Sequence, residues 1–371
     1  MTGIVNPQAF GRGGGHYWRV ALTIDITGMA DERYVFAPSP LAELTSMLHA
    51  LSEPGHHPAL HGWIAATSAS LKPELSERLI EADFLWRSAR ADFFVPGQPQ
   101  ATLAQELDEV DRLDDETYVF SALITTSCGS TPLHRLFSRE KALEQAMARG
   151  PRQAEFAERL LADPPRVRAW VRRLLEDCEQ AFFAESWARV QHQLAADSRH
   201  KADLLAHRGL SAMLGAVSPS VSLQDNRIVV DKLQDNATTA HGSGVTFIPT
   251  AFGHPHLLVV HAPGWRPVIQ YPVAAQGLPD PIPLRLVQQR IDALAHPVRR
   301  RLARTIARGP HTTGELADAW QLTAPEVSRH LTVLKQAGLV TVSRRGRYVL
   351  YQLDLTVCAR LGADFVEAIL R

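Results

Sequence analysis

The segment 312–353 constrains the fold more than any other stretch of this sequence, because two helix-start signals follow each other closely within it. Thr312 stands three residues before Glu315, and Thr323 stands three residues before Glu326. This is the spacing of a capping box, in which a threonine hydroxyl accepts a hydrogen bond from an otherwise unpaired helical amide. The segment therefore predicts two short helices joined by a turn.

The second of these helices has two chemically different faces. Its apolar residues recur at helical spacing, and a glycine follows as a left-handed stop; they are Val327, Leu331, Leu334, Ala337 and Gly338. The other face carries Ser328, Arg329, Thr332 and Lys335. Hydroxyls and long cations donate hydrogen bonds to phosphates and to base edges in the major groove. We therefore predict a DNA-reading helix, with Thr323 contacting DNA at its start and His330 buttressing it or contacting DNA.

After Gly338 the apolar pattern changes to a period of two, and Arg345 and Gly346 stand at the reversal. This predicts a two-stranded hairpin with Arg344, Arg345 and Arg347 at its tip. Guanidinium groups on such a tip can contact the neighbouring DNA backbone or minor groove. The alternative is a solvated turn.

The runs AHPVRRRLARTIARGP, TTGELADAW, LTAPEVSRHLTVLKQAGLV and RRGRYVLYQL, within residues 295–353, together resemble the winged helix of ArsR-type (arsenical-resistance repressor) transcription factors. The resemblance implies a homodimeric, cytoplasmic repressor or activator whose DNA affinity changes with a signal. It also implies that Ser328, Arg329 and His330 lie on the DNA-facing helix. Metal-sensing members carry a Cys-x-Cys motif on the first helix of the pair, where this chain has the residues ELAD from Glu315. Metal sensing through that site is therefore not expected.

The net charge of the chain is zero, but the charge is unevenly distributed. Residues 285–371 contain 14 Lys or Arg against 7 Asp or Glu, and residues 1–284 contain 25 against 32. The two parts therefore carry net charges of +7 and −7. This asymmetry favours electrostatic attraction of a polyanion, double-stranded DNA, by the C-terminal part alone.

A chain of 371 residues that is 45% hydrophobic is long enough for two or three globular domains. We expect an α+β protein with a flexible leader at 1–18, an N-terminal α/β sensor or dimerisation domain at 19–275, a Pro-rich linker at 276–283 and a winged-helix domain at 284–371. Residues 73–206 read mainly as helices. Four short β-rich runs after Val217 predict a small antiparallel sheet.

The N-terminal part, including YVFAPSPLAEL and GVTFIPTAF, is similar to an uncharacterised domain found ahead of ArsR-type winged helices in some bacterial regulators. That resemblance brings no assigned activity.

The sequence has no signal-peptide core and no apolar run of the ~20 residues that span a membrane. Cys128, Cys178 and Cys358 lie far apart, which fits neither a disulfide framework nor a ligand cluster and favours a reducing cytoplasm.

No spacing-defined catalytic motif occurs, so we do not expect an enzyme, and we expect no cofactor. His56, His57 and His61 could bind a metal, but they stand among prolines and glycine in a loop, so we interpret them as structural or solvent-exposed and expect no metal. Cys128 reads as a buried thiol, with a nucleophile as the alternative. Arginines 166, 168, 172 and 173 share a helix with acidic residues, which favours a paired solvated face over a nucleic-acid stripe.

Small-molecule sites are concave, mostly aromatic and apolar, with a few polar groups. The best candidates for such an effector pocket are Trp187, Phe252, His254, Trp265 and Tyr271. The alternative is that these side chains are ordinary sheet core and edge residues.

The last helix, with Val357, Leu361, Phe365 and Ile369 at a spacing of four, carries one apolar stripe that needs a partner. Two-fold readers of DNA pair their domains, so we expect dimerisation through it. The alternative is that this helix packs on its own domain. The competing hypothesis for the whole chain is an enzyme or ligand-binding protein whose winged helix mediates protein contacts.

Overall fold

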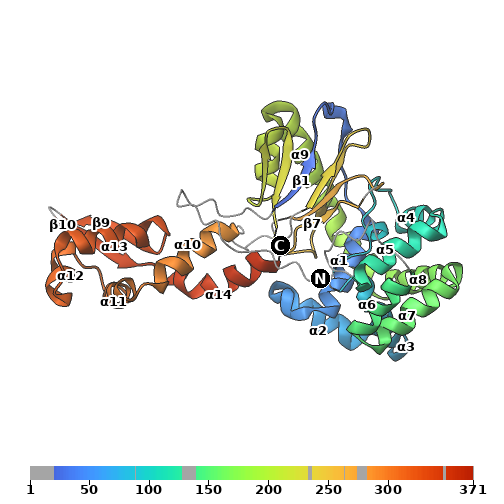
Figure 1. The fold of residues 1–371 in the computed structure, drawn as a ribbon, viewed down its shortest axis with the longest axis horizontal. Coiled ribbons are helices and arrows are strands. Elements are labelled where there is room, and N and C mark those ends of the chain that lie inside the picture. The colour runs from blue at the N-terminus through green and yellow to red at the C-terminus, as the bar shows by residue number, and fades with distance from the viewer. Residues whose placement is uncertain are drawn as a thin grey trace, which may run out of the picture.

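The computed structural model describes residues 21–87, 89–127, 139–232, 236–262, 264–273, 282–345 and 348–370. The expected leader, Cys128, most of the expected linker and Arg347 lie outside these residues. The N-terminal part has strands near both of its ends in sequence and helices between them, and the C-terminal helices, orange to red, extend to one side of it (Figure 1). The α+β class expected from the sequence is therefore confirmed.

The first of two sheets in the N-terminal part has the strand order β3-β4-β1-β5. Its strands are β3 (Val221–Gln224), β4 (Arg227–Asp231), β1 (Ala21–Asp25) and β5 (Asn236–Thr239). Strand β1 is antiparallel to β4, with Leu22 opposite Val230 and Ile24 opposite Ile228, and parallel to β5. These four side chains are buried, so one face of the sheet carries a core.

The second sheet has the order β2-β6-β8-β7. Its strands are β2 (Tyr34–Phe36), β6 (Val245–Thr250), β8 (Val268–Pro272) and β7 (Leu258–Val260). The first three are mutually parallel, and only β7 is antiparallel to its neighbour. Every residue of β6 is buried, which is typical of a central parallel strand that is covered on both faces.

The expected small antiparallel sheet is therefore wrong in two respects: the described residues of the N-terminal part form two sheets, and both contain parallel pairs. The physical reason is that β1 and β2 pair with strands about 200 residues further along the chain. Alternation within a strand indicates which face is buried, but it does not encode the direction of a distant partner.

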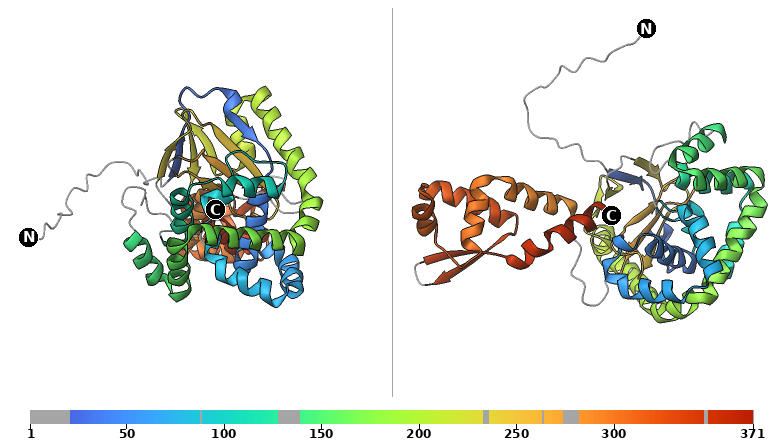
Figure 2. Two further views of the ribbon diagram at one scale, coloured as in Figure 1. Left: turned by 90° about the vertical axis from the view of Figure 1, so that its right-hand side faces the viewer. Right: turned by 90° about the horizontal axis from the view of Figure 1, so that it is seen from below.

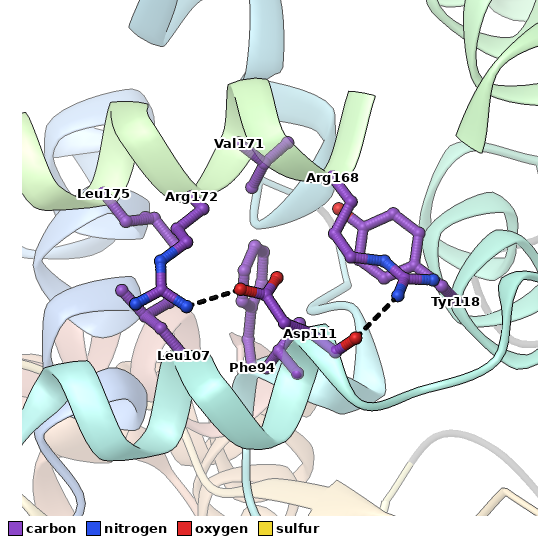
Figure 3. Close-up of a pocket in the computed structure, with 9 residues that line it drawn as sticks. Phe94, Leu107, Asp111, Tyr118, Arg168, Val171, Arg172 and Leu175 are labelled. Carbon is purple, nitrogen blue, oxygen red and sulfur yellow. Dashed lines mark hydrogen bonds and ion pairs between the residues drawn. The ribbon is translucent and has the colours of Figure 1, made fainter. Parts of the chain in front are cut away.

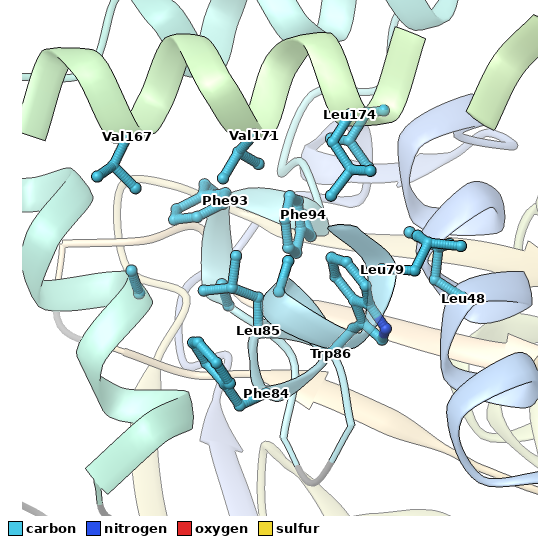
Figure 4. Packing of buried hydrophobic residues seen from close by; sticks show 14 of the residues in the cluster. Leu48, Leu79, Phe84, Leu85, Trp86, Phe93, Phe94, Val167, Val171 and Leu174 are labelled. Atoms are coloured by element: carbon cyan, nitrogen blue, oxygen red, sulfur yellow. The ribbon is translucent and has the colours of Figure 1, made fainter. Parts of the chain in front are cut away.

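Helices between β2 and β3 make up the rest of the N-terminal part. They are α1 (Pro40–Ser52), α2 (His61–Ser70), α3 (Pro73–Ala82), α4 (Leu103–Asp111), α5 (Asp115–Ser127), α6 (Arg139–Arg149), α7 (Pro151–Ala162), α8 (Pro164–Cys178) and α9 (Ala184–Val217). Val167, Val171 and Leu174 of α8 face Phe93 and Phe94 in the main hydrophobic cluster (Figure 4). A π-helical turn, Glu179–Phe183, joins α8 to α9, which contacts β3 and β6.

The C-terminal part folds around its own hydrophobic cluster, to which Leu302, Leu316, Val327, Leu331 and Leu334 belong. Its elements are α10 (Leu284–Ala295), α11 (Pro297–Ile306), α12 (Thr313–Trp320), α13 (Ala324–Gln336), β9 (Val340–Arg345), β10 (Tyr348–Leu353) and α14 (Leu355–Leu370). Figure 2 shows the β9–β10 ribbon projecting beside the helices. Among the described helices, none combines the length and apolarity needed to cross a bilayer.

Candidate nucleic-acid interface

Two capping arrangements fix where α12 and α13 begin. The Thr312 hydroxyl accepts a hydrogen bond from the Glu315 amide at 3.2 Å, and the Glu315 carboxylate accepts one from the Thr312 amide at 2.7 Å. The Thr323 hydroxyl accepts a hydrogen bond from the Glu326 amide at 3.4 Å. Between the helices, Gln321 adopts a left-handed conformation with φ 51°. Both predicted helix starts are confirmed, and the turn between them is sharp.

Helix α13 separates its apolar and polar residues as the sequence predicted. Val327, Leu331 and Leu334 are at most 1% exposed and hold the helix against the C-terminal core. The opposite face is exposed, and it carries Thr323, Ser328, Arg329, Thr332 and Lys335. These are groups able to donate hydrogen bonds to a polyanion. The Thr332 hydroxyl donates to the Ser328 carbonyl at 2.8 Å within the helix.

His330 differs from its neighbours because it is half-buried. Its ring packs against His296 with a centroid distance of 4.8 Å, and burial lowers the pKa of His330. His296 in turn caps α11, because its Nδ1 accepts a hydrogen bond from the Val298 amide at 3.2 Å. His330 was expected either to buttress α13 or to contact DNA, and this geometry supports the first role.

The ribbon beside α13 is antiparallel, with Tyr348 opposite Arg345 and Val349 opposite Arg344. Arg344 is exposed on β9 and Arg345 ends that strand, whereas Arg347 is outside the described residues. The predicted hairpin is therefore confirmed. One cation near its tip, Arg344, is placed on the surface.

A buried arginine that the sequence analysis missed ties the ends of the domain together. The Arg290 guanidinium, on α10, donates through Nη1 to Asp364 of α14 at 3.0 Å and through Nε to the Ala337 carbonyl, just after α13, at 3.3 Å. The Arg290 and Asp364 side chains are only 10% and 7% exposed. The available signal was a lone cation between Val287 and Ala293 on an otherwise apolar helix face.

Other arginines of the basic C-terminal part have structural partners. Arg299 donates to the Asp292 carbonyl at 2.9 Å and Arg300 to the Ala295 carbonyl at 2.6 Å, so both satisfy carbonyls at the end of α10. The Arg301 guanidinium lies 5.9 Å from the ring centre of Trp320. Part of the positive charge counted in the sequence therefore also holds α10, α11 and α12 together.

The residues expected to line an effector pocket are distributed over several contacts. Trp187 stacks on Phe183, Phe252 packs against Trp63, and Trp265 packs at the edge of two hydrophobic clusters. The buried Tyr271 hydroxyl donates to Asp197 at 2.6 Å, and burial raises the pKa of Tyr271. The His254 carbonyl accepts a hydrogen bond from His57. These contacts fit the core-and-edge alternative.

A cleft lies elsewhere, between α4 and α8 (Figure 3). Its cavity volume of about 10 Å³ is close to that needed for one water molecule, so this conformation has no room there for a metabolite. Arg168 and Arg172 close it. Arg172 pairs with Asp108, Asp111 and Glu176, and Arg168 pairs with Asp115. The expected pairing is confirmed for these two arginines, but their side chains are only 12% and 25% exposed, so they do not form a solvated face.

Comparison with known families assigns both parts of the chain. The model of the family of unknown function DUF5937 matches residues 20–277, and a helix-turn-helix domain model matches residues 294–343. The chain belongs to the DUF5937 family. The second match covers α12 and α13 and confirms the predicted helix-turn-helix. This DUF5937 protein therefore carries a helix-turn-helix domain after the family domain.

The DUF5937 protein is similar over short stretches to transcriptional repressors. It is 34% identical over 65 residues to the transcriptional repressor SdpR of Bacillus subtilis, covering 18% of this chain and 72% of that protein. It is 40% identical over 91 residues to the HTH-type transcriptional repressor SmtB of Mycobacterium tuberculosis, covering 24% and 67%. A crystal structure of a possible transcriptional regulator for arsenical resistance is 38% identical and covers 21% of this chain and 80% of that one, with a TM-score of 0.20.

Proposed function

We propose that this protein is a sequence-specific, DNA-binding transcription regulator of ArsR type, in which residues 284–371 bind DNA and residues 19–275 receive a signal. The observation that carries the proposal is the exposed polar face of α13. Its hydroxyls and cations are held outward by a buried apolar face and by capped helix ends. The similarity of the chain to the repressors SdpR and SmtB supports the same function.

Residues on this interface divide into two groups by what they would contact. Ser328, Arg329 and Thr332 lie on α13 and contact base edges in the major groove. Lys335 and the arginines of the ribbon, 344, 345 and 347, contact mainly phosphates. Thr323 contacts the backbone at the start of α13, and His330 supports the helix from beneath.

The experiment is to select bound DNA from a genomic pool with the full-length protein and then measure the affinity of variants for the selected duplex across salt concentrations. Arg329→Ala should weaken binding to the selected sequence by roughly tenfold or more, because a bidentate arginine contact contributes about 1–3 kcal/mol of base discrimination. Arg344→Ala should weaken binding to all duplexes and reduce the salt slope by about 1.

Arg173→Ala is the matched control, because Arg173 is an exposed arginine on α8, far along the chain from the proposed interface. It should bind like the wild type. A loss of DNA affinity in Arg173→Ala with none in Arg329→Ala would place the interface elsewhere. Absence of salt-dependent duplex binding by the wild type would favour the enzyme or ligand-binding hypothesis.

We propose that the regulator is a homodimer that pairs through α14. This helix packs against α10, yet Phe365, Val366 and Ile369 near its end are 39–43% exposed. Pairing with a second copy would remove these side chains from water. It would also set the two α13 helices at a separation that lets them enter successive major grooves. Light scattering should give twice the chain mass for the wild type and one chain mass for Phe365→Glu.

A small-molecule signal received by the N-terminal domain is the remaining part of the proposal. It is motivated by the length of that domain, which far exceeds what a winged helix requires. Thermal-shift measurements of the full chain against a metabolite panel test it. An effector should also change the affinity for the selected DNA, and a flat response in both assays would contradict an effector.

A further inference from the structure

We propose that His49, His56 and His256, with His57 beside them, form a binding site for a divalent transition-metal ion such as Zn²⁺. We call these four residues the histidine cluster. One ring nitrogen from each of His49, His56 and His256 can be chosen so that all three lie within 4.8 Å of one another. The His57 ring lies 5.0 Å from both the His49 and the His256 rings, measured between centroids.

The histidine cluster is assembled from three separate segments of the N-terminal domain. His49 is on the last turn of α1, His56 and His57 belong to the following turn η2 (Pro54–His56) and its C-cap, and His256 precedes β7. The sequence analysis considered only neighbours in the loop, so His56 and His57 read as structural. The partners His49 and His256 are brought there by the packing of α1 against the second sheet.

Two of the rings are held in the tautomer that a metal ligand needs. His49 Nδ1 lies 3.0 Å from the Trp86 carbonyl oxygen, and His57 Nδ1 lies 2.6 Å from the His254 carbonyl oxygen. A carbonyl oxygen only accepts, so each Nδ1 carries the proton and each Nε2 keeps its lone pair. Metal-bound histidines commonly donate their other ring N–H to a carbonyl in this way.

The spacing of the facing nitrogens also suits a shared ion. His49 Nε2 and His256 Nε2 are 3.1 Å apart. Two imidazole nitrogens at the usual Zn–N distance of about 2.0–2.1 Å in a tetrahedral site are separated by about 3.3–3.4 Å. A metal ion could therefore be accommodated with a movement of only a few tenths of an ångström between these two rings.

Two buried ring nitrogens of the histidine cluster lack a hydrogen-bond partner. Within the described part of the chain, His57 Nε2 and His56 Nδ1 are buried and make no hydrogen bond. Such atoms normally find a partner, because leaving them unpaired costs about 1–3 kcal/mol. Coordination would supply a partner for His57 Nε2 directly.

Two rings of the cluster, those of His49 and His57, are also in the protonation state that binds metal. Burial lowers the pKa of His49 to about 3 and that of His57 to about 4, with Arg90 contributing to both. Their rings are therefore neutral at physiological pH. The positive charge of Arg90, which also disfavours a bound cation, is opposed only in part by Glu43, because burial raises the pKa of Glu43 to about 7. Neutral imidazoles without thiolate favour Zn²⁺, Cu²⁺ or Ni²⁺ over Mg²⁺ or Ca²⁺.

A direct hydrogen bond from His256 to His49 is the competing explanation of the 3.1 Å contact, and it needs no metal. The two explanations differ in the number of Zn²⁺ ions that they predict per chain, which is one for the metal site and none for the hydrogen bond alone. Full-length protein, prepared without a polyhistidine tag and stripped with a chelator, should bind one Zn²⁺ per chain by titration calorimetry. Co²⁺ in place of Zn²⁺ should give the visible absorption of a tetrahedral nitrogen-ligated ion.

His56→Gln and His256→Gln are the informative variants, because both residues are only half-buried and their substitution should leave the fold intact by circular dichroism. Each should bind Zn²⁺ at least tenfold more weakly. His207→Gln, an exposed histidine on α9, is the control and should bind like the wild type. Absence of a one-to-one site in the wild type, or equal affinity in all four proteins, would overturn the proposal.

The cluster is placed to influence the C-terminal domain, because α14 contacts the η2 turn that carries His56. This last step rests on the proposed function: Zn²⁺ should change the affinity of the wild type for its selected DNA and leave that of His256→Gln unchanged. The two proposals fail separately. Zinc binding without DNA binding would refute the regulator and keep the site, whereas DNA binding without zinc binding would refute the site alone.

Discussion

Replacing Arg290 by methionine should loosen the DNA-binding domain without touching its DNA-facing residues. The substitution keeps an apolar stem of similar length and removes the guanidinium group, and with it the hydrogen bonds to Asp364 and to the Ala337 carbonyl. Asp364 would then remain as a carboxylate that is only 7% exposed.

The size of the effect follows from what remains around Asp364. Removing one partner of a buried ion pair costs about 3–5 kcal/mol, because the other charge stays buried. Arg360 lies 3.4 Å from the same carboxylate, but its side chain is 39% exposed and its contact is correspondingly weaker. We therefore expect the low end of the range, about 3 kcal/mol, which corresponds to roughly a 100-fold larger population of the opened domain.

Hydrogen exchange of the full-length protein, read by mass spectrometry on peptides from α13, measures this population directly. Protection of the α13 amides should fall roughly 100-fold in Arg290→Met, whereas protection of β6 in the N-terminal domain should be unchanged. The double variant Arg290→Met, Asp364→Leu should recover most of the protection, because it leaves no unpaired charge.

Two outcomes would refute this reasoning. A loss of protection below fivefold in Arg290→Met would show that the ion pair contributes no more than a surface pair. A double variant as weakly protected as the single one would show that the arginine acts through the Ala337 carbonyl and not through Asp364.

Three further changes have defined outcomes. Thr323→Ala should destabilise the C-terminal domain by about 1 kcal/mol, measured by thermal denaturation, because it removes the N-cap of α13. Gly244→Ala should cost at least about 2 kcal/mol in urea denaturation, since φ is +89° there and a Cβ would stand 2.4 Å from the Arg33 carbonyl oxygen. Burial raises the pKa of Asp92 to about 7 in the folded state, whereas in the unfolded chain this carboxyl ionises with a pKa of about 3.9, so the wild type loses stability as pH rises from about 4 to 7. Asp92→Asn should therefore gain stability relative to the wild type across that pH interval, and a pH-independent difference in urea midpoints would contradict this.

Local signals in the sequence were sufficient for the helix-turn-helix. The caps at Thr312 and Thr323 act within one turn, and the apolar spacing from Val327 to Leu334 reports directly on one face of one helix. The exposure of Ser328, Arg329 and Lys335 follows from the same periodicity. Their contact with DNA stays a prediction.

Contacts between distant segments could not be predicted in the same way. Arg290 stood out as a cation on an apolar face, but Asp364, its partner, lies 74 residues away. His49 and His256 are 207 residues apart, and nothing in their local spacing brings them together. The expected effector pocket grouped aromatic residues by composition and not by a pattern that specifies contact, and it stays a prediction.

Pairing of β1 with β4 has a consequence for synthesis on the ribosome. Asp25 is opposite Arg227, so about 200 residues must be translated before β1 meets its first partner, which takes roughly 10–40 s at 5–20 residues per second. During that interval the apolar side chains of β1 and β2 have no described sheet to join. The helical segment, residues 40–217, is complete before these partner strands are synthesised. Chains that terminate before residue 227 should be prone to aggregation through these unpaired strands.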